Sequence, residues 1–243
     1  MMRPALVFAA MLAALSGVAN AADAPRIAII IDDLGYQLIA GRRAIALPGP
    51  VTFAILPNTP RASLLARSAY ELGKEVLVHL PMQADVDDNA DASGVTLDMS
   101  RNAFATAIDQ AIASVPYAIG FNNHRGSLIT RHPGHMRWLM EELGMRERMF
   151  FVDSYTTHQS VALQIAAESG IRAIKRDVFL DNDPAPGTIR AEFERLKLFA
   201  RQRGAAVAIG HPYETTLAFL EIELPKLAAE GFELVPISEL VAN

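Results

Sequence analysis

The sequence predicts an α/β fold: a single distorted (β/α) barrel with seven or eight parallel strands. Short apolar, β-branched runs alternate with segments of helical period along the chain, which is the pattern of repeated βαβ units and a parallel sheet. Some runs are apolar at every position, such as residues 27–31 (IAIII), as expected for strands covered on both faces. The number of units favours a closed or nearly closed barrel. An open, doubly wound sheet is the alternative, but the glycine motifs of nucleotide-binding folds are missing from the sequence.

The predicted elements follow one another in regular order. Each predicted strand is a short apolar run that leads into turn residues, and these runs cover residues 26–31, 51–55, 75–80, 118–121, 149–152, part of 173–180, 205–209 and 233–235. Segments of helical period lie between them, at residues 37–46, 61–72, 100–114, 133–143, 158–169, 188–203 and 213–229. Residues 82–94 are rich in Asp and predict a solvated loop. No internal repeat or linker divides the chain, so residues 22–243 are expected to form one domain.

Residues 1–21 predict a signal peptide and are not part of the expected fold. Arg3 is followed by an apolar run, and residues 19–21 (ANA) have the small-x-small pattern that a signal peptidase recognises. The run is short for a membrane span, which needs about 20 apolar residues, so an uncleaved anchor is the less favoured alternative. We therefore expect a periplasmic or secreted protein with no transmembrane span after cleavage of the signal.

The composition excludes several classes of site and partner. Cysteine is absent, so neither a disulfide nor a cysteine nucleophile can form, and any transition metal must bind His, Asp or Glu. The net charge of −5 lacks the basic excess of a nucleic-acid-binding protein, so we expect no nucleic acid as a partner. No G-x-S-x-G motif is present, which disfavours a serine hydrolase.

Polar and ionisable residues gather where the predicted strands end. In chain order these residues are Asp32, Asp33, His79, Asn122, His124, Asp153, Asp181 and His211. In a parallel barrel they all lie on the C-terminal face, where the active sites of such folds are built. The residue types suit a catalytic Zn²⁺ ion that activates water, with a second carboxylate to take the water's proton and a further histidine to protonate the leaving group. Because Asp32 and Asp33 are adjacent, we expect their side chains to diverge, one to the metal and the other to the water.

Seven blocks of sequence, in order along the chain, resemble the divergent polysaccharide deacetylase family. They are residues 31–33 (IDD), 51–54 (VTFA), 79–82 (HLPM), 122–127 (NNHRGS), 151–154 (FVDS), 176–181 (RDVFLD) and 210–212 (GHP). Together these blocks are distributed along nearly all of the chain after the predicted signal peptide. This family is a remote branch of the carbohydrate esterases that remove N-acetyl groups from amino sugars on a distorted (β/α) barrel.

The resemblance implies roles for particular residues. Asp32 would be the general base and His211 the general acid, and a divalent metal, expected to be Zn²⁺, would bind Asp33, His79 and His124. Substrate binding or orientation of the base and acid would fall to Asn122, Asp153, Arg176, Asp181 and Tyr213. Better-known deacetylases carry two metal histidines three residues apart on one segment, and no H-x-x-x-H occurs here. The nearest pair is His132 and His135, which we interpret as a residue near a helix start and a surface residue.

The expected function is the hydrolysis of an N-acetyl group on a cell-envelope carbohydrate, with a peptidoglycan-type glycan as the expected partner. The alternative is a non-catalytic envelope protein that keeps the fold and binds a glycan or a cell-wall remodelling protein.

Less specific explanations of the same residues also stand. Asp32, Asp33, Asp153 and Asp181 could only cap helices, and His79 could be a core histidine. A glycosidase with paired carboxylates would also suit a barrel, although its chemistry would leave the histidines without a role.

Overall fold

The computed structural model describes residues 24–85 and 94–241, so the predicted signal peptide lies outside the described residues. One sheet with parallel pairing runs through this part of the chain, in the order β6-β5-β4-β3-β2-β1-β8-β7, with β9 beside β1. Its strands are β1 (Arg26–Leu34), β2 (Thr52–Ile55), β3 (Val76–Met82), β4 (Ala118–Arg125), β5 (Phe150–Asp153), β6 (Ala173–Lys175), β7 (Val178–Phe179), β8 (Ala205–Gly210) and β9 (Glu233–Leu234). The predicted parallel sheet of a (β/α) barrel is confirmed.

The barrel is open between β6 and β7, which form the two ends of the sheet. Only Arg176 and Asp177 separate these strands in the sequence, so the chain itself crosses the opening. The backbone N–H of Arg176 donates to Asp153 on β5, and that of Asp177 donates to Val207 on β8, both at 2.9 Å. Both N–H groups of this crossing are therefore satisfied without a closing ladder of hydrogen bonds.

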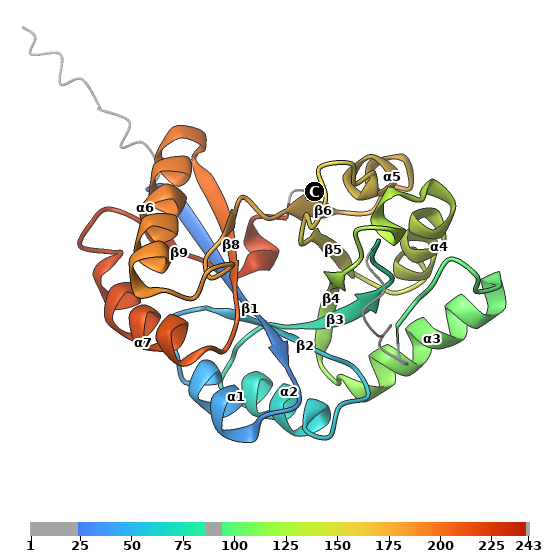
Figure 1. The fold of residues 1–243 in the computed structure, drawn as a ribbon, viewed down its shortest axis with the longest axis horizontal. Coiled ribbons are helices and arrows are strands. Elements are labelled where there is room, and N and C mark those ends of the chain that lie inside the picture. Colours follow the sequence, from blue (N-terminus) through green and yellow to red (C-terminus); the bar gives the residue numbers. More distant parts are fainter. Residues whose placement is uncertain (1–23, 86–93, 242–243) are drawn as a thin grey trace, which may run out of the picture.

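Helices surround the curled sheet as an outer layer (Figure 1). They are α1 (Leu38–Ile45), α2 (Ala62–Glu71), α3 (Arg101–Ser114), α4 (Pro133–Gly144), α5 (Ala162–Glu168), α6 (Pro186–Arg203) and α7 (Glu214–Glu223), with 3-10 turns η1 (Ile129–Arg131), η2 (Leu224–Lys226) and η3 (Ile237–Glu239). A large apolar core joins the inner faces of these helices to outward-facing strand residues such as Ile27, Ile29 and Ile31. No helix among the described residues has the length and apolar character needed to cross a membrane.

A second apolar cluster fills the inside of the barrel. It joins inward-facing strand residues such as Ala28, Ile30 and Val207 to the C-terminal segment after β9. Ile237 and Leu240 of this segment are part of the cluster, and η3 lies within the curve of the sheet (Figure 1). The segment therefore fills the barrel interior away from the carboxyl ends of the strands and leaves those ends for the site.

Three predicted strands end too early. β1, β3 and β4 continue to Leu34, Met82 and Arg125. Asp32, Asp33 and His124 therefore belong to strands and do not follow them, while His79 lies inside β3 as it does in the predicted strand. The helix predicted at 158–169 begins later, at Ala162, because Ser160 donates its hydroxyl to Asp153 and accepts from the Ala162 N–H.

Candidate metal and catalytic site

The end of β1 turns two successive carboxylates toward the inside of the barrel. Strand alternation places Ala28 and Ile30 in the interior cluster and therefore Asp32 above them. Asp33 has a left-handed backbone with φ of 59°, and the β1–β2 register shifts between Ile31 and Leu34. This irregularity brings the Asp33 side chain to the same site, so both carboxylates face His79. Their division between metal and water stays a prediction.

The two histidines come from neighbouring strands. His79 on β3 pairs in register with Asn122 on β4, and His124 lies two residues further along β4, on the same face of the sheet. β2 lies between β1 and β3 and ends at Ile55, while β3 continues to Met82. The imidazoles of β3 and β4 thus reach the carboxylates of β1 across the short β2.

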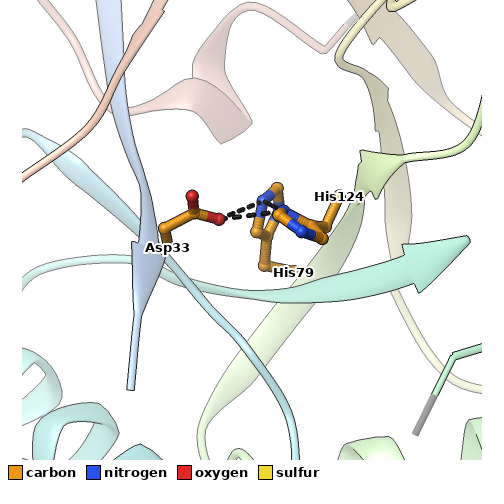
Figure 2. Close-up of side chains that lie close together, drawn as sticks. All are labelled: Asp33, His79 and His124. Carbon is orange, nitrogen blue, oxygen red and sulfur yellow. Dashed lines mark hydrogen bonds and ion pairs between the residues drawn. The ribbon is translucent and has the colours of Figure 1, made fainter. Parts of the chain in front are cut away.

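Three possible ligand atoms converge at the centre of the site (Figure 2). Asp33 Oδ1 lies 3.1 Å from His79 Nε2 and 2.9 Å from His124 Nδ1, and the two nitrogens are 3.2 Å apart. Asp33 Oδ1 is nevertheless a buried oxygen that accepts no hydrogen bond of ordinary geometry. A buried carboxylate oxygen facing two imidazole nitrogens in this way fits the donor set of a metal ion such as Zn²⁺.

Asn122 decides which nitrogen of His79 faces this centre. The Asn122 amide donates through Nδ2 to Asp32 Oδ1 at 2.7 Å, so its Oδ1 is the acceptor for His79 Nδ1 at 2.8 Å. In neutral His79 the hydrogen therefore sits on Nδ1, and Nε2 presents its lone pair to Asp33 and His124. Histidine ligands of metals are commonly oriented by such a hydrogen bond on the other ring nitrogen.

Burial and charge shift the pKa values of the carboxyl and imidazole groups in opposite ways. Burial raises the pKa of Asp32, against the opposing effects of His79 and His211 and of the Asn122 hydrogen bond. Burial would also raise the pKa of Asp33, but the adjacent His124 and His79 outweigh it and hold that pKa well below its usual range. Burial lowers the pKa of His79, yet the two carboxylates raise it overall to about 9. Without a metal, His79 is therefore protonated on both ring nitrogens below about pH 9.

His211 directly follows β8, the neighbour of β1 on the side away from β2, and is held by Asp181. Asp181 Oδ1 lies 2.8 Å from His211 Nδ1, and Asp181 Oδ2 accepts from the His211 backbone N–H and from the Thr216 hydroxyl. His211 Nε2 is thereby directed toward Asp33 Oδ2, 3.7 Å away. Burial opposes protonation of His211, but the hydrogen bond to Asp181 and the nearby carboxylates raise its pKa.

Two cavities meet at His124 and His211. The larger, which we call the acid–base cavity, has a volume of about 440 Å³ and is also lined by Asp32 and Arg176. The second, of about 330 Å³, is lined by Tyr36 and by Tyr213, whose ring stacks on that of His211. Both volumes fall within the usual range of small-molecule sites. Tyr155 lines the acid–base cavity.

The remaining predicted residues divide between the site and its support. Asp181 contacts His211 as expected, whereas Asp153 contacts neither Asp32 nor His211. Its carboxylate instead accepts from the Tyr155 N–H and the Ser160 hydroxyl, which fixes the turn after β5. Arg176 lines the acid–base cavity.

Of the closely spaced histidines His132 and His135, which lie outside the site, one was predicted wrongly. His132 is the N-cap residue of α4, as expected, but His135 is buried. Its ring packs against Trp138 and Phe104, with centroids 4.5 and 6.0 Å away, so it is a core residue rather than a surface one.

Sequence reasoning assigned no role to Thr216 or Phe179. Thr216 binds the carboxylate that holds His211, and Phe179 lines the acid–base cavity. Nothing local marks Thr216, because its partner Asp181 lies 35 residues earlier in the chain. Phe179 falls within the RDVFLD block but has the apolar character of any strand residue.

Comparison with known proteins gives one family. The family model described as divergent polysaccharide deacetylase matches residues 29–241. The uncharacterized protein YibQ of Escherichia coli strain K12 is 37% identical over 219 residues, which make up 90% of this chain and 67% of that protein.

Solved structures agree on the fold. The uncharacterized protein ATU2773 from Agrobacterium tumefaciens C58 superposes with a TM-score of 0.86 at 21% identity, over 91% of each chain. A mutant of a CE4 family pseudoenzyme with restored enzymatic activity superposes with a TM-score of 0.54 at 14% identity, over 90% of this chain and 68% of the other. At these identities the likeness concerns the fold alone.

Proposed function

This chain belongs to the divergent polysaccharide deacetylase family, and from that premise we propose that it is an exported, metal-dependent hydrolase that removes N-acetyl groups from a cell-envelope glycan. The observation that carries the proposal is the convergence of Asp33 Oδ1, His79 Nε2 and His124 Nδ1. Asp32 and His211 lie beside these atoms, as a base and an acid would.

Asp33, His79 and His124 would hold the ion, and their nitrogen and oxygen donors suit Zn²⁺. When bound, such an ion polarises the amide carbonyl and lowers the pKa of water. The proton transfers would be carried out by Asp32 and His211.

Asp32 takes a proton from the attacking water. Asn122 donates to Asp32 Oδ1, which leaves Oδ2 directed toward the centre of the site, 3.6 Å from His79 Nε2. Burial raises the pKa of Asp32, so its carboxylate is a stronger base than that of an exposed aspartate.

His211 returns a proton to the departing nitrogen. Asp181 accepts the hydrogen of His211 Nδ1 and stabilises the imidazolium, which leaves the Nε2 proton for the amine. Water adds its oxygen to the acetyl carbon as the C–N bond breaks, and the products are acetate and a free amino sugar.

The first test is the metal content of the mature protein, purified without chelator or affinity-tag nickel. We expect about one equivalent of zinc or another first-row metal, as in structural and catalytic single-ion sites. His79→Ala and His124→Ala should each lose both the metal and acetate release from N-acetylated glycan, while His132→Ala, outside the site, should keep both. Metal retained in both site variants would rule out this ligand set.

A non-catalytic glycan-binding protein is the second candidate, because the sequence lacks the H-x-x-x-H pair of better-known deacetylases. A cell-wall remodelling protein is the other partner that such a molecule could bind. Asp32→Asn separates the two functions, because it removes the base but keeps the acceptor for Asn122. Loss of acetate release with retained folding and metal supports catalysis, whereas unchanged function in cells supports binding.

A further inference from the structure

Arg176 brings a positive charge into the acid–base cavity, beside Asp32, His79 and His211. Among the described residues, no carboxylate lies within 4.0 Å of its guanidinium. Asp32 and Asp153 act on the guanidinium only from a greater distance. Burial has the largest effect on the pKa of Arg176 and lowers it. A partly desolvated guanidinium without an ion-pair partner is costly unless an anion joins it.

Backbone carbonyls hold the guanidinium in one orientation. Arg176 Nε donates to the Ser154 carbonyl at 2.7 Å, and Nη2 donates to the Tyr155 carbonyl at 3.1 Å. The Phe179 ring covers the guanidinium, with its centroid 4.8 Å from Cζ. Arg176 Nη1 donates to no group in the described part of the chain, so this edge of the fork is left for a ligand.

Asp153 explains why those carbonyls point at Arg176. Tyr155 has a left-handed backbone with φ of 51°. Its N–H donates to Asp153 Oδ1 at 2.8 Å, and Ser160 donates to Asp153 Oδ2 at 2.7 Å. The buried Asp153 carboxylate thus fixes a strained turn that serves to present two acceptors to Arg176, and it is a positioning residue.

We propose that Arg176 binds a carboxylate of the substrate, and hence that the glycan deacetylated here carries an acidic sugar close to the reacting N-acetyl group. The proposal rests on the proposed function and names its substrate class. A planar guanidinium edge matches the two oxygens of a carboxylate. Asn182 lines the same cavity and can donate a further hydrogen bond.

The charge balance of the cavity favours a carboxylate over a phosphate. Arg176 can neutralise one negative charge, while Asp32 lines the same cavity and would repel a second one. The carboxylate could be a lactyl ether, as in N-acetylmuramic acid, or a uronic acid. Both sources share the same chemistry and are separate arms of the test.

The experiment compares matched substrates with the metal-loaded protein. The probes are peptide-free strands of alternating N-acetylglucosamine and N-acetylmuramic acid, hyaluronan oligosaccharides, and both after reduction of their carboxylates to alcohols. We expect kcat/KM to fall about 10- to 100-fold on reduction of the preferred glycan, as for loss of a hydrogen bond to a charged group. Arg176→Gln should remove this difference, so that charged and reduced glycans react with similar kcat/KM. Lys175→Gln removes a neighbouring positive charge that lies over Tyr155, outside the cavity, and should keep the difference.

The contrary results are equally definite. Equal rates for charged and reduced glycans in the unmodified protein would overturn the proposal. So would an Arg176→Gln variant that slows both forms alike, because Arg176 would then act through Asp32 and not on the substrate.

Binding separates this proposal from the proposed function. If no glycan releases acetate, the deacetylase assignment fails, but calorimetric binding of the same probes still tests Arg176. Tighter binding of the carboxylate form, lost in Arg176→Gln, would support the anion site. Equal binding of both forms would overturn it.

Discussion

At the residue scale, Asn122 links the proposed base to a proposed metal ligand, since one amide binds both Asp32 and His79. Asn122→Ala should lower metal affinity by about 10- to 100-fold, because partners of this kind orient the ligating ring. Competition with a chromogenic chelator measures the change. Asn123→Ala is the matched control, since Asn123 binds Arg125 O and Ser154 N and not His79. Unchanged metal affinity in Asn122→Ala would remove the orienting role.

The proton on His79 predicts how metal affinity depends on pH. The pKa of His79 in the metal-free protein is raised to about 9, so below that pH an incoming ion must displace a proton from Nε2. Affinity should therefore rise by about tenfold per pH unit toward pH 9 and then level off. Zinc titrations at pH 7.5, in buffers of different ionisation enthalpy, should show about one proton released per ion. Zero release would contradict the protonated site.

At the element scale, the irregular end of β1 holds Asp33 in a backbone conformation that few residues tolerate. Asn adopts the left-handed region readily, whereas a β-branched residue does so at a cost. Asp33→Asn and Asp33→Val both remove the charge, but Val should be less stable than Asn by about 1–2 kcal/mol in the free energy of unfolding. Urea denaturation of the two metal-free variants measures this difference. Equal stabilities would show that the β1 irregularity carries no strain.

At the scale of the whole molecule, the packing that stabilises the barrel interior and the candidate site lie at opposite ends of the barrel. The C-terminal segment packs Ile237 into the interior cluster, while its backbone N–H groups donate to Thr52 Oγ1 and to Glu75. The site lies at the carboxyl ends of β1, β3 and β4. This is the division seen in parallel barrels in general.

Ile237→Ala tests this division. Loss of a buried isoleucine should lower the free energy of unfolding by about 2–5 kcal/mol. Metal affinity of the folded protein should stay within about twofold, because distant sites rarely couple. Denaturation and metal titration on the same variant measure both quantities. A parallel loss of metal affinity would mean that the two ends of the barrel are coupled.

The sequence by itself determined the order of strands and helices, the parallel sheet and the set of polar residues near the strand ends. These follow from local patterns: apolar runs covered on both faces, helical periods and turn residues between them. The family resemblance then named Asp33, His79 and His124 as ligand candidates, but the predicted strands stopped short of Asp33 and His124, which β1 and β4 include.

Only the tertiary structure decided how these side chains meet. The Asn122 bond to Asp32 joins residues 90 positions apart, and the Asp181 bond to His211 joins residues 30 apart. The left-handed Asp33, the role of Asp153 in its turn and the burial of His135 likewise depend on neighbours from other elements. Local periodicity carries no information on such contacts, because hydrogen-bond geometry and charge balance arise only when distant segments are packed together.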